Sequence, residues 1–520
     1  MVAGDIAAAL GMAPSSRSLH RNGLARAAVL AALLPLTACT VGPDFVPPAA
    51  PAVKHLAPAS TASRLSPGAG EPVQRFIEDQ PVSAQWWRLF RNPALDRVER
   101  EALAASPTLA AARATLAQAR EAVAVARGGY YPQVDLAASA ERQKGPPFAL
   151  GLLPSASQGL PIFNLYQVGP TVSFLPDAFG LTARTVEAQQ ALADTQEYQL
   201  AAARLTVTGS VATQALAIAS LRRQIEAVQA IVAEDRRNLA LVREARAAGR
   251  ANRSDELAAQ TQLAEDRAAL PPLRAQCSTA QDALAVLVGR APTAWAPPRF
   301  DLDGFTLPAR LPVSLPSTLV RQRPDIQAAQ AQLHARSAAI GIATAQMYPS
   351  FPISASIGTA ALAATTLGTS RSIFWTLAGG LTVPIFHGGA LQAQRRAAVD
   401  AFHASLAVYR QTVLAAFGQV ADTLHALDDD AAKAAADLQR IRYAAGRGRV
   451  LDLIEAERAA QRARIGYTNA QAQRDLDTAR LFVAMGGGWQ DSTFGASLCP
   501  DCGRRLRAGL AAPQPSRGSK

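Results

Sequence analysis

The longest regular pattern of apolar and polar residues lies between Thr182 and Gly249. This segment contains no proline, and Ala, Leu, Gln, Glu and Arg dominate it, so helix propensity is favourable almost throughout. In its second half, apolar residues follow alternating steps of four and three, which is the seam of a coiled coil. These residues are Leu221, Ile225, Val228, Val232, Leu239 and Val242, interrupted by Asp235. The pattern predicts one helix, about 100 Å long at ~1.5 Å per residue, that needs partners along its length.

Elsewhere the period changes to two, with apolar residues alternating with small or polar ones. Four runs have this pattern, near 134–140, 166–174, 353–358 and 374–386. They predict two strand pairs, at about 134–177 and 350–387. Strands with one apolar face are typical of a membrane β-barrel wall, and equally of an ordinary antiparallel sheet with one buried face. Because four strands cannot enclose a lumen, a membrane location implies an oligomer.

Two parts of the chain follow the same plan. Pro107 and Pro324 open similar segments that end at Pro132 and Pro349, with a constant offset (324 − 107 = 217 and 349 − 132 = 217). The offset between matching positions then falls from 209 to 197 along the second long helix, about Ala390–Gly446. This helix is therefore 12 residues shorter than the first (209 − 197), or roughly three turns. We predict an internal twofold repeat, with its first copy at 81–300 and its second at 301–489.

The N-terminus has the composition of an export signal. Three arginines precede a short apolar run at 27–36, too short for a permanent transmembrane helix, and the run ends in Leu36-Thr37-Ala38-Cys39. This ending resembles the lipobox of bacterial lipoproteins, in which the cysteine is acylated and becomes the new N-terminus. We therefore expect a signal peptide at 1–38 and a covalent lipid on Cys39. An ordinary signal peptide with an unmodified cysteine is the alternative, and Met12 is a second candidate start.

Three further segments have less regular sequences. Residues 39–80 are rich in Pro, Ala and Ser and predict a linker that tethers the lipid. The tail, 490–520, contains Cys499 and Cys502 and a basic end, and we expect it to be disordered. The acidic run Asp428-Asp429-Asp430 is expected to be a solvated face.

Composition argues against several classes of function. The 52 basic and 40 acidic side chains give a net charge of +12, but no aromatic-interleaved basic cluster accompanies it, which argues against a nucleic-acid partner. The sequence contains no P-loop, G-x-S-x-G or H-E-x-x-H motif, and none of its six histidines are paired at helical metal-ligand spacing. We therefore expect a protein that is not an enzyme and that carries no metal or cofactor apart from its covalent lipid.

Short motifs along the chain resemble those of the outer-membrane factors, the TolC-like efflux channels, in their lipoprotein branch (NodT/OprM type). The resemblance covers Cys39 to Trp489. Its motifs are Val41-Gly42-Pro43-Asp44, Trp86-Trp87, Asp177-Ala178-Phe179-Gly180, Leu284-Ala285-Val286-Leu287-Val288-Gly289, Arg323-Pro324-Asp325-Ile326, Pro384-Ile385-Phe386, Val420-Ala421-Asp422 and Gly486-Gly487-Gly488-Trp489. The resemblance implies an α+β membrane protein of the outer membrane. Each chain of a homotrimer would give four strands to a twelve-stranded β-barrel and its long helices to a coiled-coil tunnel in the periplasm.

The resemblance also implies roles for residues at the two helix tips. Gly249 and Arg250 at the first tip, and Gly446 and Arg447 at the second, would contact a periplasmic adaptor protein. Glycine at a helix reversal also has an ordinary turn role, and the two interpretations are compatible.

A closed entrance is implied next to the tips. Tyr443, Ser254 and Asp255 match positions whose polar links hold the family's helices closed. The basic partner expected two residues after the second tip glycine is here Gly448, so this chain departs from the family's closing network.

Two carboxylates follow the second tip. Asp452 and Glu455 are three residues apart and so share one helix face, which on most surface helices is merely solvated. In the family's pattern these positions, usually two aspartates, point into the entrance, where a trimer would gather six carboxylates. Such rings favour cations.

The function implied is the exit channel of a tripartite efflux pump, conducting small molecules passively while an inner-membrane RND-type transporter supplies the energy and selects the substrate. One alternative is the outer duct of a type I protein-secretion system, which can share this fold. Another is a structural coiled-coil lipoprotein without a pore. The lipobox and Arg323-Pro324-Asp325-Ile326 favour the efflux branch, and the alternating strands argue against the poreless lipoprotein.

Overall fold

The computed structural model describes residues 40–49, 51, 53, 74–78, 82–144, 162–313, 316–444 and 450–489. For residues 431–432, 434–444, 450–462 and 464 it describes the backbone alone. The chain divides into two compact units, which we call the strand unit and the helix unit. The strand unit comprises Met1–Asp44, Ala124–Ala188 and Ser337–Val399, and the helix unit comprises Phe45–Val123, Gln189–Arg336 and Asp400–Lys520.

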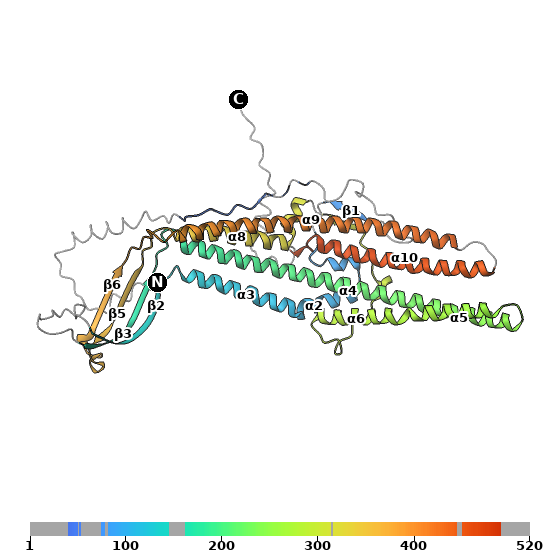
Figure 1. The fold of residues 1–520 in the computed structure, drawn as a ribbon, viewed down its shortest axis with the longest axis horizontal. Helices are drawn as coiled ribbons and strands as arrows, with labels where there is room; N and C mark the ends of the chain where they lie inside the picture. Colours follow the sequence, from blue (N-terminus) through green and yellow to red (C-terminus); the bar gives the residue numbers. More distant parts are fainter. Residues whose placement is uncertain are drawn as a thin grey trace, which may run out of the picture. The chain divides into compact units, whose positions relative to one another are not determined.

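Helices dominate the described chain, and the same order of helix, two strands and long helix occurs twice in it (Figure 1). The helices are η2 (Trp86–Phe90), α2 (Pro93–Ala105), α3 (Pro107–Gly128), α4 (Leu181–Ala247), α5 (Arg253–Ala268), α6 (Leu270–Val288), η4 (Leu302–Gly304), α7 (Pro316–Gln322), α8 (Pro324–Ala345), η5 (Ala364–Thr366), η6 (Ser370–Ser372), α9 (Ala390–Ala444) and α10 (Val450–Ala484). The strands are β1 (Arg75–Glu78), β2 (Gln133–Lys144), β3 (Ile162–Phe174), β4 (Arg310–Val313), β5 (Ile353–Ala361) and β6 (Ile373–Gly379). No described helix combines the length and the apolar sequence that a membrane span requires.

The strand unit is built on one four-stranded sheet in the order β2-β3-β5-β6, with every neighbouring pair antiparallel. The two predicted strand pairs are therefore present, and β3 joins them by pairing with β5. The last predicted run, 374–386, was too long, because β6 ends at Gly379. Beyond it only Thr382 makes an isolated bridge, to Ser350, and Pro384 has no N–H to continue the ladder.

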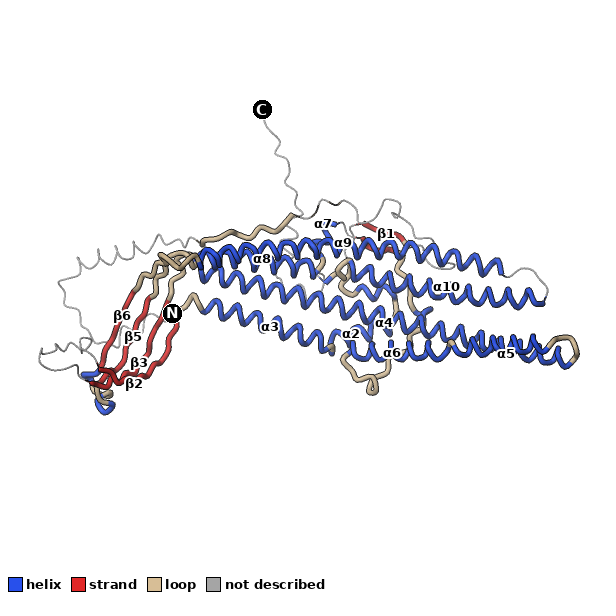
Figure 2. The backbone as a smooth tube through the Cα atoms, viewed as in Figure 1, coloured by secondary structure: helices blue, strands red, loops and turns tan. Residues whose placement is uncertain are grey.

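The predicted helix at 182–249 is confirmed as α4, which runs from Leu181 to Ala247. Its coiled-coil seam is also confirmed: Val228, Val232 and Leu239 pack in one cluster with Leu263 of the returning helix α5. Figure 2 shows α4 and α5 side by side as a hairpin. The second long helix, α9, has 55 residues against 67 in α4, which gives the predicted difference of 12 (67 − 55).

The core of the helix unit contains an aromatic cluster. Trp86, Trp87 and Phe90 on η2 are fully buried, and the Trp86 ring stacks on Phe482 of α10 with centroids 5.5 Å apart. Gly487 follows α10 with a φ of +60°, and a Cβ there would lie 2.2 Å from a methyl carbon of Leu205. The tryptophan and glycine motifs therefore meet in one core.

The segment 39–80 is more than the linker that its composition predicts. Within it, β1 pairs in parallel with β4, from Arg75–Arg310 to Glu78–Val313. Beside β1, the buried side chain of Gln74 accepts a hydrogen bond from Arg474 Nε at 2.8 Å. Residues 74–78 therefore pack within the helix unit, shortly before Trp86 in the sequence.

Replacing Trp86 with alanine should lower the free energy of unfolding by about 3–5 kcal/mol, because the ring is buried and stacked. Chemical denaturation of the purified protein in detergent measures this loss. Leu89→Ala, on the same short helix but with a side chain 41% exposed, is the matched control and should change stability by no more than about 0.5 kcal/mol. Equal losses in the two variants would contradict the placement of the core.

Candidate functional site

The sheet of the strand unit has one apolar face and one polar face. Cross-strand partners point to the same side of a sheet, so the register sorts the residues. Val134, Val172, Ala355 and Leu377 form one row across all four strands, and Asp135, Thr171, Ser356 and Thr376 form the next row, on the opposite face. The sheet therefore has the amphipathic pattern of a membrane β-barrel wall.

The apolar face is exposed. Leu136, Trp375 and Leu377 have exposed fractions of 78%, 75% and 68%, and Figure 2 shows the four strands side by side as one sheet. An ordinary antiparallel sheet would bury such a face against a core. The outer edges of β2 and β6 also pair with no other described strand.

The first helix tip is a capped reversal. Gly249 follows α4 with a φ of +72°, and the Arg250 N–H donates to the Ala245 carbonyl at 2.7 Å. This is the left-handed glycine cap that ends many helices, and the strained φ explains why glycine stands there. The Arg250 side chain is exposed.

An ion-pair cluster that the sequence did not indicate holds this hairpin together. Glu256 on α5 accepts hydrogen bonds from Arg246 and, at 2.9 Å, from Arg243, both on α4. These hydrogen bonds, from Arg246 first and then Arg243, lower the pKa of the Glu256 carboxyl. The partners are 10 and 13 residues apart in sequence, so no helical spacing signals the contact.

The residues proposed for the gate lie next to the two helix tips in the sequence. Asp255 accepts from the Asn252 backbone N–H at 2.8 Å and completes a capping box at the start of α5. Ser254 is exposed in the same turn. Tyr443 lies in the last turn of α9, where the backbone alone is described, so a contact among the three stays a prediction.

The backbone of Asp452 and Glu455 lies in the first turns of α10, as a shared helix face requires. Their side chains are outside the described part. Cys39, Gly446 and Arg447 also lie outside the described residues, as do the predicted signal peptide 1–38 and the tail 490–520.

The motif Arg323-Pro324-Asp325-Ile326 forms a buried joint. The Arg323 guanidinium donates to the Asp325 carboxylate at 2.6 and 3.0 Å, to Gln419 of α9 at 2.9 Å and to the Ala484 carbonyl at the end of α10 at 2.9 Å. Next to it, the Trp489 indole N–H donates to the Gln322 carbonyl at 2.7 Å. One arginine thus fixes α8, α9 and α10 together.

The motif Asp177-Ala178-Phe179-Gly180 forms the turn from β3 into α4. Asp177 accepts from the Thr182 and Ala183 N–H groups at 3.0 and 2.7 Å, and so caps the long helix. Gly180 has a φ of +80°, and a Cβ there would lie 2.8 Å from the Thr40 Cα.

The start of the described chain is clamped onto this turn. The buried Arg184 side chain donates to the Val41 and Gly42 carbonyls at 3.2 and 3.3 Å and to the Asp44 carboxylate at 2.8 Å. The Val41 N–H donates to the Phe179 carbonyl at 3.2 Å. We call these contacts the Arg184 clamp. They give Val41-Gly42-Pro43-Asp44 a structural role that the prediction of a linker did not include.

Comparison with known proteins decides the family. The model of the family described as "Outer membrane efflux protein" matches residues 98–290 and 315–487, which is more than half of the chain. The chain belongs to this family. As an outer membrane efflux protein, it is a component of the bacterial outer membrane.

Relatives of known name extend over nearly the same length. The chain is 29% identical over 456 residues to the pyoverdine export outer membrane protein OpmQ of Pseudomonas aeruginosa, covering 84% of this chain and 95% of OpmQ. It is 29% identical over 473 residues to outer membrane protein OprJ of the same species, with coverage of 88% and 95%. The solved structure of the outer-membrane channel OprN is similar with a TM-score of 0.73 at 25% identity, covering 87% of this chain and all of that one.

This outer membrane efflux protein also carries a carboxyl pair between its last two long helices. Asp428 and Asp429 are exposed, as expected of a solvated face, but Asp430 is half-buried and one of its oxygens has no hydrogen-bond partner. Burial, then a hydrogen bond to the buried Asp477 of α10, raise the pKa of Asp430 to about 7. The expectation of a solvated face was therefore wrong for Asp430.

The free energy of unfolding of this protein should fall as pH rises towards the raised pKa of Asp430, about 7. The folded Asp430 holds a proton up to about pH 7, whereas an unfolded aspartate loses it near ~3.9. Between these two pKa values the folded protein therefore binds one proton more than the unfolded chain. Stability decreases towards neutral pH, by at most about 1.4 kcal/mol per pH unit. Thermal melting between about pH 5 and about pH 8 should show a shallower slope for Asp430→Asn than for the wild type. Asp428→Asn, exposed on the same helix, should keep the wild-type slope; the reverse result would contradict the assignment.

Proposed function

We propose that this protein works as a homotrimeric exit channel of a tripartite efflux pump, passing small molecules through the outer membrane without chemical conversion. The observation that carries the proposal is the exposed apolar face of the sheet beside its two unpaired edges. Membership of the outer membrane efflux protein family supports it. The names of the relatives, such as the pyoverdine export protein OpmQ, favour small-molecule efflux over protein secretion as the task.

The sheet is the basis for the trimer. In lipid, unpaired N–H and C=O groups at a strand edge cost several kcal/mol each, so a β-sheet spans a membrane only as a closed barrel. Four strands per chain are too few to enclose a lumen, and three chains would supply twelve (3 × 4). In that barrel the row through Val134 and Leu377 faces lipid and the row through Asp135 and Thr376 faces the lumen.

An internal twofold repeat supports a barrel to which each copy gives the same number of strands. The elements α3, β2, β3 and α4 are followed in the same order by α8, β5, β6 and α9. The family model likewise matches two successive segments of the chain. Each copy then gives two strands to the barrel and one long helical hairpin to the periplasmic tunnel.

The proposed partners meet the protein at the tips. An adaptor protein would contact Gly249 and Arg250 on the first hairpin and Gly446 and Arg447 on the second. An inner-membrane RND-type transporter supplies the energy. The covalent lipid on Cys39 anchors each chain to the outer membrane, and the Arg184 clamp two residues later supports this placement, because it fixes where the lipidated end leaves the protein.

Cysteines on the two outer strands should link neighbouring chains. In a Cys499→Ser/Cys502→Ser background, Leu136→Cys on β2 combined with Leu377→Cys on β6 should give covalent trimers with a short bifunctional thiol reagent. Within one chain the two strands are separated by three strand spacings, about 14 Å, which a reagent shorter than about 10 Å does not span. Each single variant is the control and should give no trimer on a denaturing gel. Monomers alone from the double variant would refute the closed barrel.

The entrance carboxylates should control ion preference. Purified protein in planar bilayers should conduct, and conductance should favour cations because six carboxylates would line the entrance. Asp452→Asn/Glu455→Gln should bring the ratio of cation to anion permeability towards one and remove block by divalent cations. Glu244→Gln/Glu265→Gln removes as many charges from exposed positions on α4 and α5 and should leave the preference unchanged. Absence of any conductance would overturn the channel, whereas an unchanged preference in the first variant would overturn only the ring.

A further inference from the structure

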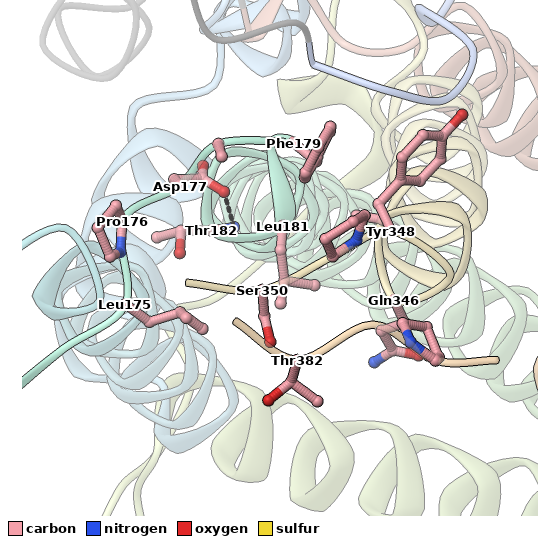
Figure 3. A pocket seen from close by; sticks show the side chains of 14 residues that line it. Leu175, Pro176, Asp177, Phe179, Leu181, Thr182, Gln346, Tyr348, Ser350 and Thr382 are labelled. Carbon is pink, nitrogen blue, oxygen red and sulfur yellow. Dashed lines mark hydrogen bonds between the residues drawn. The ribbon is translucent and has the colours of Figure 1, made fainter. Parts of the chain in front are cut away.

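The strand unit contains a cavity of about 300 Å³ where its strands end. Its lining comes from three connections: the turn from β3 to α4, the turn from α8 to β5, and the chain that follows β6. Residues from these connections are Leu175, Phe179, Leu181, Tyr348, Ser350 and Pro384. Figure 3 shows Phe179 beside Tyr348, and their ring centroids are 4.9 Å apart.

The one charged side chain of the lining, and two of its backbone segments, are paired within the protein. The Asp177 carboxylate accepts from the first N–H groups of α4, as the dashed line in Figure 3 shows for Thr182. Ser350 and Thr382 exchange both backbone hydrogen bonds at 2.9 Å. The rest of the lining consists largely of leucine, alanine, proline and aromatic side chains, with the polar side chains of Gln346, Ser350 and Thr382 among them, which suits a mainly hydrocarbon occupant.

The lipid-bearing end of the chain arrives at this cavity. Thr40 is the residue next to Cys39, and it packs on Gly180, directly beside Phe179 of the lining. The Val41 N–H bonds the Phe179 carbonyl at 3.2 Å, and the buried Arg184 holds the next residues in place. An acyl group on Cys39 would therefore start within one residue of the cavity wall.

The cavity also lies at the level where such a chain should enter the bilayer. β3 ends one residue before Leu175, β5 begins three residues after Ser350, and β6 ends at Gly379 shortly before Thr382. If these strands cross the hydrocarbon, their shared end is its boundary. Exposed apolar side chains continue past β6, with Ile385 and Phe386 at 92% and 86% exposed, as expected beside lipid.

We propose that the cavity holds an acyl chain of the lipid carried by Cys39. The proposal rests on the lipidation of Cys39 that forms part of the proposed function. A space of about 300 Å³ has room for on the order of ten groups the size of a water molecule, at ~30 Å³ each. That is most of one acyl chain. The acyl chain in the cavity would hold the lipid next to the turn from β3 to α4, and the other acyl chains of the lipid would enter the membrane.

Photo-crosslinking tests the occupant. Cells fed a fatty acid with a diazirine near its end incorporate it into lipoproteins and phospholipids. After irradiation, the purified full-length protein is digested and analysed by mass spectrometry. We expect a link from the N-terminal lipopeptide to the segments 175–182 or 345–350. Ser350→Phe, which fills the cavity, should lose this link, whereas Ser354→Phe, on an exposed position of β5 outside the lining, should keep it.

A second variant separates the two sources of acyl chains. Cys39→Ala, exported by an ordinary signal peptide, cannot carry the lipid, so links to the cavity segments should disappear. Links that persist there would show that membrane phospholipid fills the cavity and would overturn the proposal. Links from the lipopeptide only to the strands or to other lipids would also overturn the proposal. Links to the cavity segments that Ser350→Phe leaves unchanged would overturn it too. An N-terminal peptide without any acyl mass would refute the anchor itself, and conductance in bilayers tests the channel independently.

Discussion

The unpaired outer edges of β2 and β6 impose the constraint on which the other features depend. Those backbone groups find no partner among the described strands, and the row through Leu377 gives the sheet an exposed apolar face. In the proposed barrel this face meets lipid, where no water can satisfy the unpaired edge groups. Both demands are met when sheets of several chains close on one another. Closure would also bring the long helices of neighbouring chains together, whereas within one chain α4 already packs against α5, α6 and α10.

The regular parts of the fold could be predicted because they repeat. The seam through Val228 and Val232 fixed the long helix to within two residues at each end, and the period of two located all four strands of the sheet. Predictions failed where a single contact determines the local structure. β6 stops at Gly379, before Pro384, which has no N–H for the ladder. Residues 41–44 are held by Arg184, 140 residues after its partner Asp44. No local pattern encodes a partner at that distance.

The motifs that carry the family resemblance mostly form joints between elements. Asp177 caps α4, Arg323 binds the ends of α8 and α10, and Gly487 lets the chain pass over Leu205. None of these residues needs a ligand to explain it. The predicted site residues at the tips are different. Gly249 and Asp255 have clear turn and cap roles, while the roles proposed for Tyr443, Asp452 and Glu455 would need neighbours that one chain does not supply. A sequence can mark such positions only through resemblance.

The unequal lengths of α4 and α9 have a rotational consequence. Each residue turns an α-helix by about 100°, so the difference of 12 residues (67 − 55) amounts to three full turns and roughly a further third. A whole number of turns would have left the end of α9 facing the same way as the matching part of α4. With the extra third, equivalent positions near the two tips face directions about 120° apart around their helix axes. A partner that grips both hairpins therefore meets two distinct surfaces, and each needs its own complementary face.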